Sequence, residues 1–170
     1  MAGSDESGRQ PAQRVIREFQ KRRRTLPRWE APGSTYSVRA SVARERCERL
    51  TDPRLGEIVQ ESLHYHDGRR YRLHFYCLMP DHLHAVLEPM PRDGGSVPLP
   101  EIMRAVKGFT ARQINVLVGA RGAFWLDEGF NRIIRCEEEY WHWYSYIRLN
   151  PVKAGLVDDP SEWRWWWEIY

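Results

Sequence analysis

Cysteine is scarce in this chain of 170 residues, which contains three. Cys47, Cys77 and Cys136 are scattered and odd in number, so they do not form the pattern of a disulfide framework, and no Cys-x-x-Cys pair indicates a zinc site. The pattern is that of reduced thiols in a cytoplasm. We therefore expect a cytoplasmic protein without a disulfide framework.

Long hydrophobic runs are also absent. No apolar stretch approaches the roughly 18 residues that a membrane-spanning helix needs, and residues 1–7 contain neither the basic nor the apolar region of a secretory signal. Hydrophobic residues make up 42% and charged residues 29% of the chain, which is typical of a soluble globular protein. We expect one domain with a tail and no membrane partner.

A strong surplus of one charge is missing from most of the chain, although the formal net charge is +3. Residues 1–33 hold eight Lys and Arg against four Asp and Glu, whereas residues 34–170 hold eighteen against nineteen. We expect residues 1–33 to be a flexible basic extension that can touch phosphates, and residues 34–170 to form a single domain. Because that domain is nearly neutral, nucleic-acid binding would require a local basic patch.

The hydrophobic pattern predicts the order strand, helix, strand, strand, helix, strand, helix. Strands are expected over 36–42, 70–79, 82–88 and up to 134, and helices over 53–66, 101–118 and 137–150. Pro151 is expected to end the last helix. A β-α-β-β-α-β core is the ferredoxin-like split arrangement, an α+β fold with an antiparallel sheet and both helices on one face. The last helix is extra, and we place it near the free face of the sheet.

The segment around His82 and His84 is the one on which the functional interpretation depends. Residues two apart on a strand share a face, so the two imidazoles would project side by side, about 7 Å apart along the strand. Leu83, Ala85 and Leu87 would point the other way, into a core. An imidazole pair at this spacing suits a divalent metal ion. A lone His-x-His is nevertheless more often a pair of ordinary strand histidines.

A second polar set lies in the expected last helix. Residues four apart stack on one line of a helix, which aligns Tyr146 with Asn150 and, one turn earlier, with His142. Tyr146 offers a nucleophilic phenol and Asn150 a carbonyl oxygen for Mg²⁺ or Mn²⁺. Ordinary packing of the tyrosine and a simple helix end at the asparagine are the alternatives. Tyr140 and Tyr144 are rival tyrosines, but neither has a polar ligand-type residue four positions later.

Basic residues outside the buried stripes are candidates for phosphate contact. Arg104, Lys107 and Arg112 lie off the apolar stripe of the helix over 101–118, where a solvated face is the plain alternative. The full set of candidates for a DNA-binding patch is Arg104, Lys107, Arg112, Arg132, Arg135 and Lys153.

Three segments, in this order, resemble the REP-associated tyrosine transposases, which belong to the single-tyrosine HUH transposase superfamily. The segments are Met79–His84, Phe124–Arg135 and Tyr146–Val157. The similarity covers roughly residues 35–168. The combination of the three segments is specific, whereas His-x-His alone is not.

The resemblance implies a ferredoxin-like HUH endonuclease fold whose added C-terminal helix carries the tyrosine. It implies metal-dependent cleavage and joining of single-stranded hairpin DNA through a covalent 5′-phosphotyrosine, as a step of DNA transposition. By position, His82 and His84 match the ligands of Mg²⁺ or Mn²⁺, and Tyr146 matches the nucleophile. Asn150 matches a polar third ligand one turn after the tyrosine, with His142 as its rival.

Two features depart from the family pattern, namely the basic N-terminal extension and the tryptophan-rich stretch over 162–167, where relatives tend to have a Trp-Ser-Ser-like sequence. Most of these tryptophans are expected to pack the last helix onto the rest of the chain, although exposed ones would stack on bases. Two other functions stay open: a domesticated module that binds structured nucleic acid without turnover, and a water-using metallohydrolase in which Tyr146 is structural. A monomer is favoured over a dimer.

Overall fold

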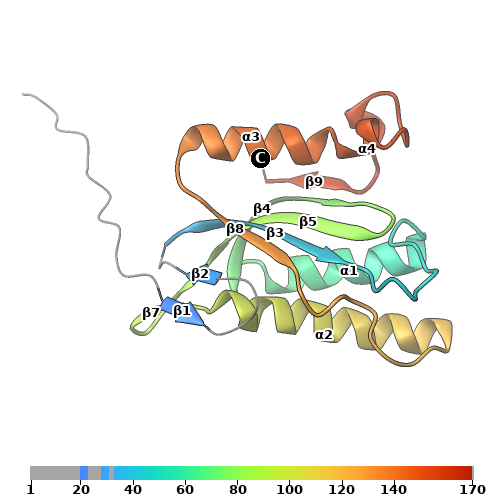
Figure 1. Ribbon diagram of the computed structural model, residues 1–170, viewed down its shortest axis with the longest axis horizontal. Helices are drawn as coiled ribbons and strands as arrows, with labels where there is room; N and C mark the ends of the chain where they lie inside the picture. The colour runs from blue at the N-terminus through green and yellow to red at the C-terminus, as the bar shows by residue number, and fades with distance from the viewer. Residues whose placement is uncertain (1–19, 23–27, 31–32, 170) are drawn as a thin grey trace, which may run out of the picture.

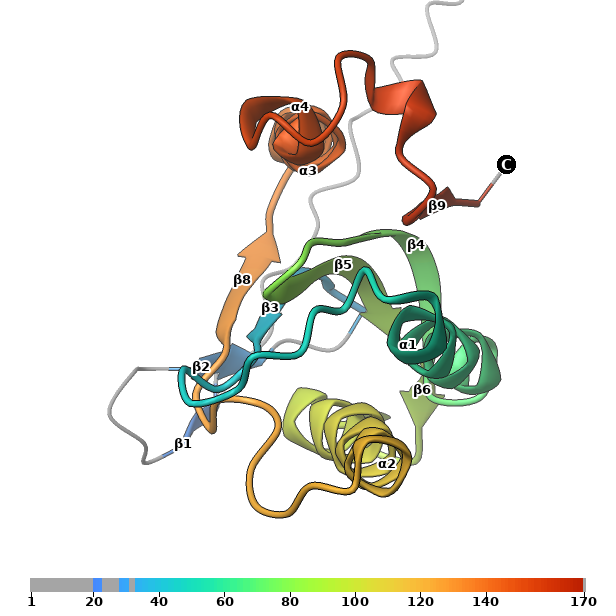
Figure 2. The same cartoon turned by 90° about the vertical axis from the view of Figure 1, so that its right-hand side faces the viewer.

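The computed structural model describes residues 20–22, 28–30 and 33–169. Its main sheet consists of β3 (Thr35–Ser41), β4 (Tyr71–Leu78), β5 (His82–Pro89), β8 (Phe130–Ile134) and β9 (Trp166–Glu168). These strands are antiparallel to their neighbours and lie in the order β8-β3-β5-β4-β9. Helices α1 (Pro53–His66) and α2 (Leu99–Val118) cover one face, and α3 (Glu137–Arg148) lies over the other (Figure 1, Figure 2). The predicted ferredoxin-like α+β fold is confirmed, with its added C-terminal helix on the opposite face.

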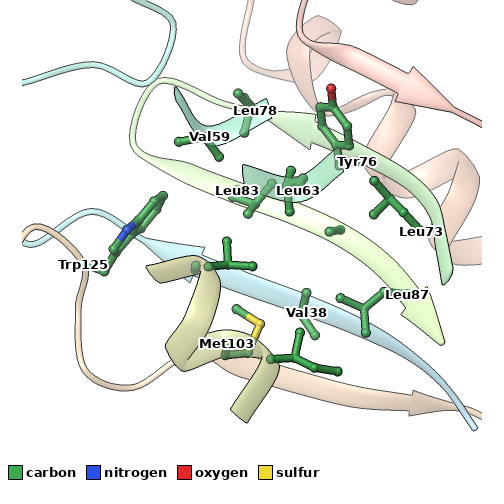
Figure 3. Packing of buried hydrophobic residues seen from close by; sticks show 14 of the residues in the cluster. Val38, Val59, Leu63, Leu73, Tyr76, Leu78, Leu83, Leu87, Met103 and Trp125 are labelled. Atoms are coloured by element: carbon green, nitrogen blue, oxygen red, sulfur yellow. The ribbon is translucent and has the colours of Figure 1, made fainter. Parts of the chain in front are cut away.

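The central strand β5 is covered on both sides, which explains its unusual composition. Every residue from His82 to Leu87 is buried. Leu83, Ala85 and Leu87 face α1 and α2 and belong to the main hydrophobic core, part of which is drawn in Figure 3. The alternate positions face α3, where Val86 joins a second, smaller cluster. The strand therefore buries an apolar face and a histidine-bearing face at the same time.

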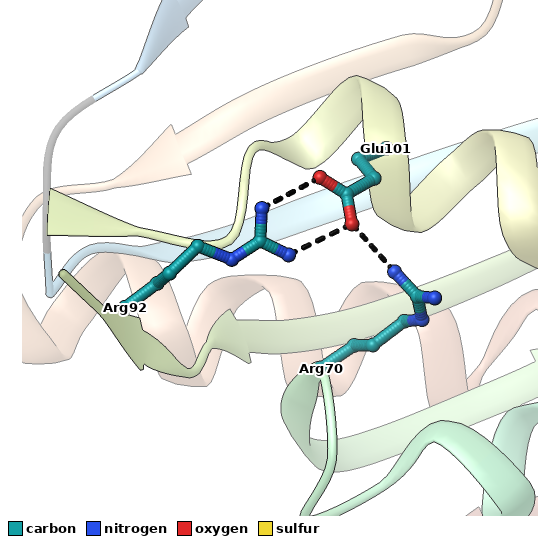
Figure 4. Close-up of polar contacts among 3 residues, drawn as sticks. All are labelled: Arg70, Arg92 and Glu101. Atoms are coloured by element: carbon teal, nitrogen blue, oxygen red, sulfur yellow. Dashed lines mark hydrogen bonds and ion pairs between the residues drawn. The ribbon is translucent and has the colours of Figure 1, made fainter.

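The two core helices begin where local chemistry favours a helix start. The carboxylate of Asp52 accepts the backbone N–H of Arg54 at 3.0 Å and caps α1. Helix α2 begins at Leu99, two residues before the predicted position, and ends at Val118, where the next residue, Gly119, has a φ of 66° that favours glycine. Near its start, Glu101 forms ion pairs with Arg70 at 2.6 Å and with Arg92 at 2.8 Å (Figure 4). The hydrogen bonds from the two arginines lower the pKa of Glu101 to about 2, and the bond from Arg92 has the larger effect.

Helix α3 packs on the sheet through Ile147 and through the rings of Tyr140 and Tyr144, which lie 5.6 and 5.3 Å from that of Phe75 on β4. Its start carries Glu137, Glu138 and Glu139, which suits the positive end of the helix dipole. The carboxylate of Glu139 also accepts the backbone N–H of Arg135 at 2.8 Å. Of the residues of α3, Ile147 alone is fully buried. The smaller cluster that joins α3 to the sheet consists of Phe75, Cys77, Met79, Val86, Ile134 and Ile147.

The end of α3 differs from the prediction. Pro151 does not end the helix: α3 stops at Arg148, and a second short helix, α4 (Asn150–Lys153), follows with Pro151 in its first turn. Proline is tolerated there because the first N–H groups of a helix have no partner within the helix. The break falls at Leu149.

The C-terminal tryptophans form an unpredicted fifth strand. Strand β9 follows the short 3-10 helix η1 (Pro160–Glu162) and pairs with β4. Trp165 is buried and lies directly over Gly56 of α1, where an added Cβ would come within 2.4 Å of its ring. Trp166 stacks on Phe75 at 5.6 Å between ring centroids. Both tryptophans are thus packing residues; Trp166 packs on α3 as expected, through Tyr144, whereas Trp165 packs on α1.

Two small hairpins lie outside the main sheet. Strands β1 (Gln20–Arg22) and β2 (Arg28–Glu30) pair with each other, as do β6 (Pro91–Arg92) and β7 (Gly95–Ser96). The prediction of a flexible extension over 1–33 falls largely outside the described residues, and the single domain over 34–170 stays a prediction. No helix in the described part of the chain is long and apolar enough to cross a membrane.

Candidate active site

The two histidines of β5 lie side by side on the face covered by α3. Their ring centroids are 4.8 Å apart and the rings are nearly perpendicular. His84 is 5% and His82 9% exposed, so both imidazoles are largely shielded from water. In the register of the sheet, His84 lies between Arg39 on β3 and Cys77 on β4.

His82 is oriented by the residue that precedes it. Its Nδ1 lies 2.7 Å from a carboxylate oxygen of Asp81, so the Nδ1–H donates to the carboxylate and Nε2 is left with its lone pair. Burial opposes ionisation of Asp81, but the hydrogen bond with His82 lowers the pKa of the carboxyl overall. For His82 itself, burial outweighs this carboxylate and lowers the pKa of the imidazole. A neutral, carboxylate-oriented imidazole is the usual state of a metal ligand.

Of the two histidines, His84 has the more strongly lowered pKa. Burial first, and then the positive charges of His82 and Arg39, lower the pKa of His84 to about 3. Its Nδ1 is buried and has no hydrogen-bond partner among the described residues. A buried polar atom without a partner is rare in folded proteins and calls for an explanation. A neutral imidazole with an unused ring nitrogen is what a cation site requires.

Tyr146 lies beside this pair, on α3. Its ring centroid is 6.0 Å from that of His84 and 5.6 Å from that of Trp143. The side chain is 39% exposed, so solvent or a ligand can reach it. The ammonium group of Lys153, from α4, lies 5.2 Å from the centre of the tyrosine ring. The phenol is therefore flanked by a buried imidazole and by a positive charge.

The two proposed third ligands occupy different environments. Asn150 begins α4, and its amide nitrogen donates to the backbone oxygen of Tyr146 at 3.3 Å. This bond leaves the amide oxygen as the atom suited to a cation. His142 is exposed, with its ring 6.1 Å from that of Trp143. Within the described part of the chain, no ring contact or hydrogen bond joins His142 to His82 or His84.

The histidine pair and Asn150 suit a divalent cation, but they offer it few protein ligands. No group of three or more His, Cys, Asp or Glu in the described residues could hold a metal ion. Cys77 is beside His84, but burial raises the pKa of its thiol to about 12, so it does not supply a thiolate. The two neutral imidazoles remain, and an amide oxygen such as that of Asn150 would be the third protein ligand.

Arg39 was not among the residues that the sequence singled out. It is half-buried on β3, directly opposite His84, and its charge contributes to the lowered pKa values of both histidines. The available signal was the alternation of β3, in which Ser37, Arg39 and Ser41 form the polar side of the strand. Only the register shows that this polar side shares a face with the histidines.

The predicted basic patch is divided between the two faces. Arg104, Lys107 and Arg112 belong to α2, across the sheet from the histidines. Lys107 donates to the backbone oxygens of Leu126 and Asp127 and so holds the segment that follows α2. A groove of about 690 Å³ is lined by Arg104 and Lys107 of α2, by the segment that follows α2 and by Arg39 of β3, and neither histidine lines it.

Of the other three basic candidates, Lys153 lies beside the tyrosine, and the other two lie beside Glu139 at the start of α3. Arg132, on β8, is exposed and forms a 3.0 Å ion pair with Glu139. Arg135 is exposed between β8 and α3, and Lys153 is the residue over the ring of Tyr146.

No family model and no curated protein matches the chain. Among solved structures, the chain is similar to a REP-associated tyrosine transposase bound to a REP hairpin, with a TM-score of 0.66 and 22% identity over 85% of this chain and 82% of that one. It also matches a candidate transposase from Deinococcus radiodurans R1, with a TM-score of 0.46 and 20% identity over 75% of this chain and 95% of that one. The first of these likenesses shows that the two proteins share a fold.

Proposed function

We propose that this chain is a transposase of the REP-associated tyrosine kind, which cleaves and rejoins single-stranded DNA beside a hairpin with the help of Mg²⁺ or Mn²⁺. The proposal rests mainly on one observation. Tyr146 lies beside the paired imidazoles of β5, with 6.0 Å between the centroids of its ring and the ring of His84. The shared fold with a transposase bound to a REP hairpin supports a DNA partner of the same kind. One chain supplies all of these residues, so we propose that a monomer suffices, in the cytoplasm where its three free cysteines stay reduced.

The cation would be held by His82 and His84, with Asn150 as the third protein ligand. When bound, a divalent ion withdraws charge from phosphate oxygens, which are otherwise hard to attack. The two histidines are suited to this task because both are neutral at pH 7, and Asp81 keeps His82 in one tautomer. Burial of the pair also excludes competing water from the protein side of the site.

Tyr146 is the proposed nucleophile. Its phenolic oxygen forms a bond to phosphorus, the bond from phosphorus to the 3′ oxygen breaks, and the leaving oxygen takes up a proton to become a 3′ hydroxyl. The phenol proton passes to solvent, which reaches the partly exposed side chain. One phosphodiester is exchanged for another, so the strand can be rejoined without a nucleotide cofactor. Lys153 contributes a positive charge that favours the approach of the anionic phosphate.

The test is covalent trapping on a denaturing gel. Protein would be incubated with a labelled single-stranded hairpin, including its flanking strand, from beside its own gene, either with Mn²⁺ or with EDTA. We expect a metal-dependent protein–DNA adduct for the wild type, none for Tyr146→Phe, and an unchanged retarded complex for both on a native gel. Tyr144→Phe, another tyrosine of α3, is the matched control and should form the adduct normally.

The other outcomes separate the alternative functions. A retarded complex without an adduct under any condition would favour a binding module without turnover. Cleavage that leaves free phosphate ends and no crosslink would favour a water-using metallohydrolase. An adduct that survives in Tyr146→Phe would show that the nucleophile is a different residue.

A further inference from the structure

Three side chains form a row across the sheet on the face that carries the histidines. In the register of the strands, Arg39 on β3 is paired with His84 on β5 at one side and with Phe130 on β8 at the other. Directly opposite residues of antiparallel strands point to the same face. Phe130 is two strand spacings from His84, on the order of 10 Å. The row therefore leads from the buried imidazole to the edge of the sheet.

Arg39 has the features of an anion-binding residue. It is half-buried, and its Nε is a buried donor with no hydrogen-bond partner among the described residues. The unpartnered Nδ1 of His84 lies on the residue directly across from it. The ring nitrogen of His84 suits the cation, so the Nε of Arg39 is the unused donor that a different group from outside the chain would complement.

The positive charge of Arg39 restricts the kind of ligand that can bind beside it. A fixed guanidinium next to two imidazoles repels a cation, unless an anion binds between them. Non-bridging phosphate oxygens are acceptors that match the planar donor fork of arginine, so a phosphodiester satisfies both requirements. A neutral ligand would leave the repulsion between the guanidinium and the cation uncompensated.

Phe130 provides an exposed aromatic ring next to Arg39. It is 54% exposed at the edge of the sheet, on the same polar face as Arg39. Arg132 is two residues further along β8 and shares this face. An exposed aromatic ring beside basic side chains is the composition of sites that bind single-stranded nucleic acid by stacking.

We propose that Arg39 and Phe130 form a subsite for the nucleotide next to the scissile phosphate. The guanidinium of Arg39 donates to a non-bridging oxygen of that phosphate, and the ring of Phe130 stacks on the neighbouring unpaired base. This subsite rests on the proposed function, because it takes the scissile phosphate to lie between His84 and Tyr146. The base beside the cleavage point would therefore contact β8, through Phe130.

The stacking half is tested by binding, without any need for cleavage. In a Tyr146→Phe background, hairpins would carry a single abasic site at each position of the flanking strand in turn. We expect one abasic position to weaken binding by about tenfold, Phe130→Ala to weaken binding of the intact strand by a similar factor, and the two changes not to add. Phe130→Trp should restore the affinity, and Phe109→Ala, an exposed aromatic on α2, should have no effect.

The phosphate half is tested by kinetics. Arg39→Gln should slow adduct formation at saturating DNA by at least about tenfold, and the conservative Arg39→Lys should recover part of the loss. Arg121→Gln, which removes an exposed positive charge from the loop after α2, is the control and should match the wild type. Thermal melting of each variant separates a loss of folding from a loss of phosphate contact, and Arg39→Lys keeps the test decisive if Arg39→Gln does not fold.

Failure of the subsite can be told apart from failure of the proposed function. If the wild type forms the adduct but the Arg39 and Phe130 variants behave as their controls do, the subsite is wrong and the function stands. If no adduct forms, yet one abasic position and Phe130→Ala remain coupled in binding, the function is wrong and the stacking site stands. Additive losses at every abasic position would overturn the stacking site itself.

Discussion

A stability measurement on His84→Gln tests the buried, neutral state of the site. The pKa of His84 is lowered to about 3 from its ordinary value of 6.5, chiefly by burial. Below pH 6.5 the unfolded chain takes up a proton on this histidine, which the folded chain does not take up until about pH 3. The unfolded state therefore binds more protons in this window, and the free energy of unfolding falls as the pH falls.

The size of the effect follows from the width of the window. Between pH 7 and pH 5 the contribution of His84 to the loss of stability is about 2 kcal/mol, close to 1.4 kcal/mol for each pH unit below 6.5. Because His84→Gln removes the titrating group, the variant should lose about 2 kcal/mol less than the wild type over the same interval, whatever its stability at pH 7.

Urea denaturation at both pH values, in the presence of EDTA, measures this difference directly. Val116→Ala is the control, because it changes an exposed residue of α2 that carries no titrating group and should leave the pH dependence as it is in the wild type. If His84→Gln and the wild type lose the same stability between pH 7 and pH 5, then His84 takes up its proton over the same pH range in the folded and unfolded chains. Burial would then not keep this imidazole neutral, and the account of the site would be wrong on this point.

Two further predictions concern how a cation is held. Asp81→Asn should weaken Mn²⁺ binding by about 10- to 100-fold in calorimetry, because the carboxylate that accepts from His82 is lost; an unchanged affinity would mean that Asp81 does not orient the ligand. Asn150→Ala should weaken Mn²⁺ binding whereas His142→Ala should not, and the reverse result would make His142 the third ligand.

The strands of the site could be predicted because each has one apolar and one polar side. Leu83, Ala85 and Leu87 alternate with the two histidines, so the sequence alone placed both imidazoles on one face. The position of α3 over that face followed from topology, since the other face was already covered by two helices. What remained open was which residues of α3 come close to the histidines, because this depends on packing that no local pattern encodes.

The fifth strand could not be predicted, because its residues show no alternation. Its first two residues, Trp166 and Trp167, are both apolar: Trp166 stacks on Phe75 and Trp167 on Tyr76, and these two residues of β4 point to opposite faces of the sheet. A strand covered on both sides has no period of two to detect, and three residues are too few for a propensity argument. Arg39 was missed for a different reason: its pairing with His84 is a contact between residues 45 positions apart in the sequence, which only the strand register provides.

The most direct test of the account is to identify the residue that carries the DNA. The Mn²⁺-dependent adduct would be digested with nuclease and protease, and the peptide bearing a residual nucleotide would be sequenced by mass spectrometry. We predict a 5′-linked nucleotide on Tyr146, formed with Mn²⁺ and absent with EDTA. A nucleotide on Tyr140 or Tyr144, or cleaved DNA with no nucleotide on the protein, would contradict the proposed mechanism.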